Sequence, residues 1–518
     1  MSDGLFDAVR RQTHATIDQQ DIETVRERMA QTMQNLPDKA LLTIFSYLSH
    51  KEVLKCSLVC RKWRTFASDS RLWQVVSLRQ EYGGLKVNCL ESLLALISVR
   101  FGPSLRLMEL PMELVQPSVL HELANKCSKL QYLTLDFSTA VQLHEFNDLQ
   151  FFPARLRSLI ICLSEVIFLE NFVRRIYTFI GTLEVLHLIG TYEKIENEEE
   201  EVYEVINLHK LKAHTPNLKV INLWGVNFIN DEHVESLSTN CAHIACLGVC
   251  YCMKFRGTSL KMLLYRCKKL TCLLMEQCIL DSKAVNEAGW DKSAIEELNI
   301  TGTDLSSECL ASVLTKLPNL RWLSAGYSEY FNDEVMAAWV DSGAYKNITA
   351  LDLNYCDSLG ESILSDLLTI MGSRLIGMNL SGIGGLVEKF WLDNIPKLTQ
   401  IKILAMGVSE TCCPKVKSRI HIDQFIDAIA NHLTGIYCLE IAWDPSTLRF
   451  SEKSSKFIDI LRMKCLRLQS FVLIEGEYYE LVRSNFERAG QMTIVKSSNC
   501  NFTTLCQLLH YYNSLRFN

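Results

Sequence analysis

A six-residue pattern, L-x-x-L-x-L with other apolar residues allowed at the three marked places, recurs along most of this chain. Successive copies start 23 to 28 residues apart, except at three longer intervals. A unit of this size cannot bury its apolar side chains alone, so it has to stack on its neighbours. The pattern therefore predicts a solenoid of similar units. Clear copies start at Leu105, Leu130, Leu156, Leu183, Leu218, Ile244, Leu270, Ile295, Leu320, Ile348 and Leu375, and weaker ones at Leu398, Ile436 and Leu468.

Positions within each unit, counted from the first residue of the pattern, have different environments. Positions 1, 4 and 6 are apolar and predict burial between units, whereas positions 3, 5 and 7 of a short strand point to the opposite side. Residues 230–241 and 306–319 then show helical spacing behind Asn230 and Ser306, which are good helix N-caps. A strand and a helix in every unit are typical of a leucine-rich repeat. We expect a curved α/β solenoid, with a parallel sheet on its concave face and helices on its convex face.

One part of the chain is dense in cysteine. Residues 241–252, CAHIACLGVCYC, hold four cysteines and a histidine, a density that suggests zinc. Three of these cysteines recur 26 residues later in residues 267–278, CKKLTCLLMEQC. Metal ligands converge on one point, whereas this spacing puts one structural position into successive units, so we expect no metal site. Position 9 turns the chain out of the strand and suits a small residue that tolerates burial, as at Cys252, Cys278 and Cys356.

Insertions and terminal segments depart from the repeat. Residues 192–204, YEKIENEEEEVYE, are interpreted as a solvated acidic loop, with a contact for a basic partner as the alternative. Residues 405–436 are irregular, and the last segment lacks a clear repeat and is expected to cap the solenoid. The expected organisation is a helical extension (1–34), a three-helix segment (35–80), the solenoid (81–480) and a C-terminal cap (481–518).

The segment in front of the repeats predicts three short helices. Leu36-Pro37 suits a helix start, because proline lacks an N–H that the first turn leaves unpaired. Apolar residues then recur at helical spacing as far as Phe66. About 45 residues build only a small core. The apolar side chains in excess of that core predict docking on another protein.

This segment resembles an F-box. The family pattern is matched by Leu36-Pro37, Ile44-Phe45, Leu48, Leu54, Val59-Cys60, Trp63 and Leu72-Trp73. An F-box followed by leucine-rich repeats is similar to the substrate receptors of Skp–cullin–F-box ubiquitin ligases. The resemblance implies that the F-box binds the small Skp adaptor and, through it, the cullin–RING core. The residues implied to contact the adaptor are Leu36, Pro37, Ile44, Leu48, Leu54, Val59, Cys60 and Trp63.

The resemblance further implies that the repeats bind a target protein for ubiquitination and proteasomal degradation. In that role the chain contributes no catalytic group. The sequence contains no RING ligand pairs, Gly-rich phosphate loop or nucleophile elbow. We therefore expect neither enzyme activity nor a cofactor. The alternative is a leucine-rich-repeat scaffold or inhibitor that binds its partner without ligase turnover.

Charge and cysteine content limit the other partners. A net charge of −6 gives no electrostatic case for nucleic acid or an anionic membrane. Residues 90–101, the most apolar stretch, are too short to span a bilayer. Twenty cysteines behind an N-terminus without a secretory pattern predict reduced thiols in the cytoplasm or nucleus.

Outward positions of the repeats predict the surface that binds the target. Aromatic residues at such positions suit interface anchors, and carboxylates there favour a basic or mixed target. For the two tryptophans, shielding by neighbouring residues is the alternative. The predicted target-binding residues are Tyr132, Asp136, Trp224, Glu276, Trp322, Tyr327 and Asp352.

Overall fold

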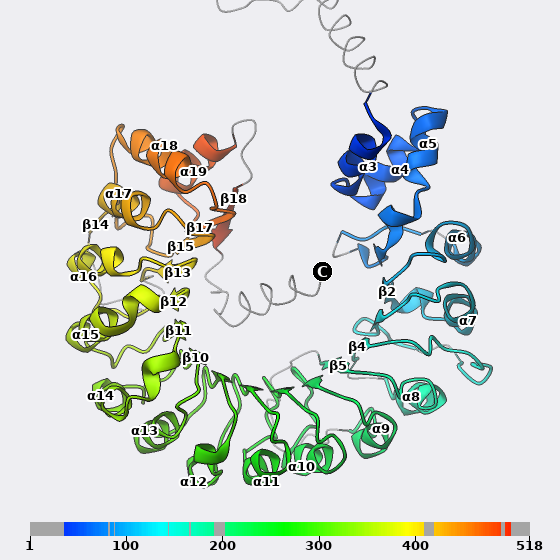
Figure 1. The fold of residues 1–518 in the computed structure, drawn as a ribbon, viewed down its shortest axis with the longest axis horizontal. Coiled ribbons are helices and arrows are strands. Elements are labelled where there is room, and N and C mark those ends of the chain that lie inside the picture. The colour runs from blue at the N-terminus through cyan, green and yellow to red at the C-terminus, as the bar shows by residue number, and fades with distance from the viewer. Residues whose placement is uncertain are drawn as a thin grey trace, which may run out of the picture. The chain divides into compact units, whose positions relative to one another are not determined.

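A computed structural model of the chain describes residues 36–80, 83–87, 89–142, 145–164, 167–190, 203–408, 419–487 and 493–498. The expected extension 1–34, most of the acidic insertion 192–204 and the end of the C-terminal segment lie outside the described residues. The chain divides into two compact units. Unit 1 runs to Leu133 and includes Leu149–Arg155, and unit 2 comprises Thr134–Asp148 and the residues from Leu156 on. Figure 1 colours the chain from blue to red.

Unit 1 begins with the three short helices that the sequence predicts. They are α3 (Asp38–Ser46), α4 (His50–Cys56) and α5 (Arg61–Ala67). Before α4, the hydroxyl of Ser49 accepts the N–H of Glu52, whose carboxylate accepts the N–H of Ser49 in return. Before α5, the thiol of Cys60 accepts the N–H of Trp63. Each of these two helices therefore begins where a side chain accepts a backbone N–H of its first turn.

The remaining elements of unit 1 belong to the first repeats. They are η1 (Ser70–Trp73), β1 (Val75–Ser77), α6 (Leu90–Leu96), a π-helical turn (Ile97–Phe101), β2 (Leu107–Pro111), a 3₁₀ turn (Met112–Leu114) and α7 (Pro117–Lys126). Strands β1 and β2 pair in parallel, with Val75 opposite Leu107. By this register, Trp73 occupies position 1 of a repeat that the leucine pattern did not identify.

Trp73 connects the three helices with this first repeat. Its indole N–H donates to the carbonyl oxygen of Ala67 at 2.8 Å. One face of its ring stacks on His50, with centroids 4.8 Å apart, and Phe101 lies 5.4 Å away between centroids. Trp73 itself is fully buried. The small helical segment thus completes its core with side chains of the repeat that follows it.

Unit 2 repeats a strand and a helix along its length. Figure 1 shows its helices on the outer side and its strands on the inner, concave face. The helices are α8 (Glu170–Ile176), α9 (Leu208–His214), α10 (Asp231–Asn240), α11 (Leu260–Arg266), α12 (Ser282–Asn286), α13 (Ser307–Thr315), α14 (Asp333–Ser342), α15 (Glu361–Met371), α16 (Glu388–Asn394), α17 (Ile422–His432), α18 (Ser454–Lys464) and α19 (Glu477–Phe486). Asn230 and Ser306 cap α10 and α13 through their side chains, as predicted.

The strands of unit 2 form one parallel sheet in chain order, with a separate parallel pair formed by β14 and β16. They are β4 (Ser158–Cys162), β5 (Val185–Ile189), β6 (Val220–Asn222), β7 (Cys246–Gly248), β8 (Cys272–Leu274), β9 (Glu297–Asn299), β10 (Trp322–Ser324), β11 (Ala350–Asp352), β12 (Gly377–Asn379), β13 (Ile403–Met406), β14 (Ile420–His421), β15 (Cys438–Ile441), β16 (Leu448–Arg449), β17 (Ser470–Ile474) and β18 (Ile494–Ser498). Strand β3 (Tyr132–Asp136) spans the boundary between the units. This arrangement confirms the predicted α/β solenoid.

Two details of the predicted repeat need correction. Strand β13 pairs Ile403 with Gly377, so position 1 of that unit is Ile401 and not Leu398. The two residues are three apart, and both fit the loose apolar pattern. The solenoid also continues past residue 480, because β18 pairs in parallel with β17. The cap predicted for 481–518 therefore begins with a further helix end and strand of the repeat.

The cysteines at position 9 share one contact. The thiol of Cys252 donates to the carbonyl oxygen of Leu223 at 3.0 Å, and that of Cys278 donates to Val249 at 3.0 Å. Cys356 donates in the same way to Ala325 at 3.2 Å. Each acceptor is position 6 of the preceding unit. The cysteines therefore recur because a small buried donor links adjacent turns.

Candidate functional site

The apolar surface of α3, α4 and α5 is the first candidate site. Leu41, Phe45 and Val53 form its buried core. None of the eight residues predicted to contact the adaptor is buried. Ile44 is 37% and Val59 64% exposed, Pro37 is exposed, and the other five are partly exposed: Leu36, Leu48, Leu54, Cys60 and Trp63. The helices thus present an apolar face that nothing in the described part of unit 1 covers completely.

Two further apolar residues extend this face beyond the predicted set. Tyr47 is 85% exposed at the end of α3, and Leu58 is 77% exposed in the turn before α5. Leu58 immediately precedes Val59. The sequence pattern does not assign Tyr47 or Leu58 to this face, because each lies in a turn, where the helical periodicity breaks. Large apolar side chains exposed in this number on so few residues are typical of a protein-binding surface.

Buried thiols argue against cysteine chemistry. Burial raises the pKa of the Cys241 thiol to about 11 and that of Cys278 to about 12. Every cysteine in the described ranges is a free thiol, and most are buried. A nucleophilic cysteine needs an accessible thiolate, which burial disfavours. Among the described residues, no group of three or more His, Cys, Asp and Glu side chains is placed to hold a metal ion.

Alkylation of the native protein with iodoacetamide at pH 8 is expected to separate these thiols. Cys89 is exposed and should react first, whereas Cys252 and Cys278 should resist, because their thiols are buried and have raised pKa values. Peptide mass spectrometry gives the rate at each residue. Modification of Cys278 at the rate of Cys89, in protein that stays folded, contradicts the assignment of position 9 as a buried structural position.

The concave face of unit 2 is the second candidate site. Trp224 is partly exposed and its ring lies 5.2 Å from that of Tyr251. Trp322 is partly exposed and packs on Ala350 and Ile403. Both tryptophans are thus partly shielded by neighbouring units, which is the alternative the sequence left open. Of the two predicted residues on β3, Asp136 belongs to unit 2 and Tyr132 to unit 1, and each is partly exposed.

Tyr327 belongs to an aromatic rim. It is 46% exposed, and its ring stacks on Tyr355 with centroids 4.4 Å apart. Both residues have positive φ, near 53° and 58°, at the place where the chain leaves the strand. Tyr355 lies against Gly382, where a Cβ atom would approach its ring to 2.6 Å. The rim therefore depends on a strained turn that recurs from unit to unit and on one glycine.

Two predicted target-binding residues lie at outward positions of the repeat but are buried. Glu276 is 7% and Asp352 0% exposed. The carboxylate of Glu276 accepts hydrogen bonds from Asn299 at 3.2 Å and from the hydroxyl of Tyr251 at 3.3 Å. Strands about 4.8 Å apart leave little room between neighbouring polar side chains. An outward position in the repeat therefore does not by itself make Glu276 or Asp352 accessible. Desolvation raises the pKa of Glu276.

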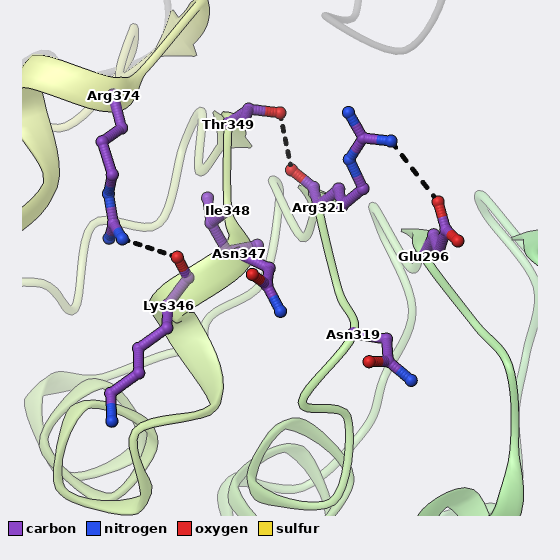
Figure 2. Close-up of a pocket in the computed structure, with 8 residues that line it drawn as sticks. All are labelled: Glu296, Asn319, Arg321, Lys346, Asn347, Ile348, Thr349 and Arg374. Carbon is purple, nitrogen blue, oxygen red and sulfur yellow. Dashed lines mark hydrogen bonds and ion pairs between the residues drawn. The ribbon is translucent and has the colours of Figure 1, made fainter.

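A separate depression of about 450 Å³ lies where β9, β10 and β11 begin. Nη1 of Arg321 lies 3.6 Å from Oε2 of Glu296, and Arg374 donates to the carbonyl oxygen of Lys346 at 2.6 Å. Figure 2 shows the two guanidinium groups directed to these different neighbours. The cationic groups do not converge, and we assign no ligand to this depression. Its lining consists of Glu296, Asn319, Arg321, Lys346, Asn347, Ile348, Thr349 and Arg374 (Figure 2).

In this chain, three helices with an exposed apolar face precede a solenoid of parallel strands. The F-box-like family model matches residues 33–79. F-box/LRR-repeat protein 12 from Homo sapiens is 35% identical over 108 residues, and its counterpart from Mus musculus is 34% identical over the same length. Each match covers 20% of this chain and 33% of the relative. Residues 33–79 are thus similar to F-box-like domains, and part of the chain is similar to an F-box/leucine-rich-repeat protein.

The crystal structure of the Rad7 and Elc1 complex in yeast contains a chain with a TM-score of 0.45 and 15% identity. The match covers 85% of this chain and 96% of that one. The chain matches a third of the length of the curated relatives named above, F-box/LRR-repeat protein 12 from Homo sapiens and Mus musculus. In the part that the structure describes, no helix is long and apolar enough to cross a bilayer.

Proposed function

We propose that this chain is the substrate receptor of a Skp–cullin–F-box ubiquitin ligase. The F-box binds a Skp adaptor and through it the cullin–RING core, and the repeats hold a target protein for ubiquitination and proteasomal degradation in the cytoplasm or nucleus. The chain contributes no catalytic group. It raises the effective concentration of a target lysine near the conjugating enzyme that the RING protein recruits.

One observation carries the proposal. The eight residues that the F-box resemblance assigns to the adaptor are exposed or partly exposed. Leu41, Phe45 and Val53 of the same helices are buried. Full burial of one such aliphatic side chain contributes roughly 1.5–3 kcal/mol. A few of them together supply the apolar centre of a specific interface.

Two double substitutions test the adaptor surface. Leu36→Ala with Pro37→Ala, and separately Leu58→Ser with Val59→Ser, are each expected to weaken binding of purified Skp adaptor at least about a hundredfold, because two apolar contacts are lost. Binding is measured by calorimetry on the full chain. The second pair lies in the turn before α5. It therefore provides a separate test if the first pair of substitutions disturbs the folding of α3.

Leu466→Ser is the matched control, since Leu466 is 83% exposed on the solenoid. It should leave adaptor binding unchanged. Undiminished binding by both double variants places the adaptor on another surface. Co-purification then separates the two functional classes: a receptor brings down the adaptor and cullin together, whereas a scaffold without ligase turnover brings down the adaptor alone.

A further inference from the structure

One edge of the sheet in unit 2 is rich in basic residues. At this edge, short segments connect the end of each helix to the start of the next strand. Four consecutive ones, residues 316–321, 343–349, 372–376 and 395–402, contain six lysines and arginines and no aspartate or glutamate. We call these six residues the basic edge: Lys316, Arg321, Lys346, Arg374, Lys397 and Lys402.

The opposite edge of the same units has the reverse charge. The segments that lead from the strand ends into α14, α15 and α16 contain Glu329 and Asp357 and no lysine or arginine. Helices end at the basic edge, and cations are favoured beside their negative ends, but this effect falls off within the last turn. It does not account for Arg321 and Lys402, which directly precede β10 and β13.

The positive charge of the basic edge is largely uncompensated. Among the residues that the structure describes, only Arg321 of the six forms an ion pair, with its Nη1 3.6 Å from Oε2 of Glu296. Lys346 is exposed and Lys402 is partly exposed. In the same part of the chain, neither of these two ammonium groups has an ion pair or a hydrogen bond.

Arg374 holds a further charge in a fixed place on this edge. Its Nη1 donates to the carbonyl oxygen of Lys346 at 2.6 Å (Figure 2), and its guanidinium carbon lies 6.0 Å from the ring centroid of Tyr345. Its Nε and Nη2 are buried and lack hydrogen-bond partners. Because water screens a partly buried charge poorly, Arg374 strengthens the positive potential of the edge.

The spacing of these cations suits an extended chain and not a single small anion. The groups do not converge on one point, but they recur from one unit to the next. Arg321 and Lys402 both occupy position 2, in units three strands apart. With about 4.8 Å between strands, this separation is about 15 Å. An extended segment rises about 3.3 Å per residue, so about five residues cover it.

A protein segment fits the basic edge better than a nucleic acid does. The edge is short, because the connecting segment before it, 287–296, carries three carboxylates and one lysine, and the one after it, 433–437, is uncharged. Nucleic acids bind through many phosphate contacts, and those carboxylates repel phosphates. The four segments contain one aromatic residue, Tyr345, which is partly buried. They therefore lack the exposed rings on which bases stack.

We propose that the basic edge binds an extended acidic segment of a partner protein. Carboxylates of the segment lie against Arg321, Lys346, Arg374 and Lys402, and the segment crosses the depression without a separate ligand in it. This surface is neither the apolar face of α3, α4 and α5 nor the outward side of the sheet. The inference therefore goes beyond the proposed function and does not depend on it.

Two labelled dodecapeptides test the inference on the full chain. One alternates glutamate with serine, and the other has glutamine in place of each glutamate. Fluorescence anisotropy at low ionic strength should show at least about tenfold tighter binding of the glutamate peptide, and added salt should reduce the difference. Lys346→Gln with Lys402→Gln should lower this preference about fivefold, because two cations of the basic edge are lost.

Lys268→Gln with Lys269→Gln is the matched control. It removes the same charge from the connecting segment 267–271, which lies outside the basic edge, and both lysines are exposed. Its preference should equal that of the wild-type protein. Equal binding of the two peptides by wild-type protein overturns the inference, and so does a preference that survives Lys346→Gln with Lys402→Gln. A control variant that loses as much preference would assign the effect to the net charge of the chain and also overturn it.

Competition with an oligothymidylate of the same length distinguishes the other class of partner. Displacement of the glutamate peptide at a lower concentration than the unlabelled peptide needs would assign the edge to nucleic acid and overturn the inference. Weaker displacement supports it. Adaptor binding is measured on the same preparations and should be unchanged by Lys346→Gln with Lys402→Gln. If the adaptor binds and the glutamate preference is absent, only this inference falls. If the preference is present and the adaptor fails to bind, the ligase proposal falls and the basic edge stands.

Discussion

Replacement of Trp73 by alanine is expected to unfold α3, α4 and α5 while unit 2 stays folded. The indole fills position 1 of the first repeat and donates to Ala67, and its ring packs between His50 and Phe101. Removal of a buried tryptophan costs about 3–5 kcal/mol. A three-helix segment of this size has little stability of its own. The loss should therefore exceed the free energy that keeps the three helices folded.

Hydrogen exchange followed by mass spectrometry measures the result segment by segment. Peptides covering residues 38–67 should lose protection in the Trp73→Ala protein, and peptides covering β6 to β12 should keep theirs. Tyr47→Ala removes an aromatic ring that is 85% exposed and should leave both regions protected. Protection of 38–67 that survives Trp73→Ala would show that the helices fold without the repeat.

The repeat was readable from the sequence because its physical cause is simple. Position 4 is buried at the centre of every unit, so it must be apolar in each copy, as Leu247, Leu323 and Met378 illustrate. The leucine pattern failed where another apolar residue filled a buried position of the repeat, or where a leucine nearby imitated it. Trp73 fills position 1 without being leucine, and Leu398 imitates the true position 1 at Ile401. Only strand pairing distinguishes these cases.

The accessibility of the concave face was harder to predict. Alternation places Asp352 and Glu440 on that face correctly, but it says nothing of how tightly adjacent strands crowd them. Both are buried, whereas Tyr327, at the turn beyond the strand, is exposed. The sequence therefore located the surface, and the structure was needed to separate its exposed residues from its buried ones. The side-chain amide of Asn354 is buried with both Oδ1 and Nδ2 lacking hydrogen-bond partners, and no sequence pattern indicates this.

Glu440→Gln is expected to stabilise the protein, and more so at high pH. In the unfolded chain the carboxyl has its ordinary pKa of 4.5, and in the folded protein desolvation and then Asp352 raise it to about 7. The folded state therefore holds the proton more tightly. The free energy of unfolding falls as pH rises from about 4.5 to about 7 and then levels off. Glutamine does not ionise and escapes this loss.

Thermal unfolding of the wild-type and variant proteins at two pH values measures the difference. The variant should be more stable by about 3 kcal/mol at pH 8 and by less than about 1 kcal/mol at pH 5. Glu452→Gln replaces an exposed carboxylate and should change stability equally little at both pH values. A Glu440→Gln gain that does not grow with pH would mean that the carboxyl is solvated or paired. A gain that grows with pH would show that burial of the ionised carboxylate destabilises the folded protein.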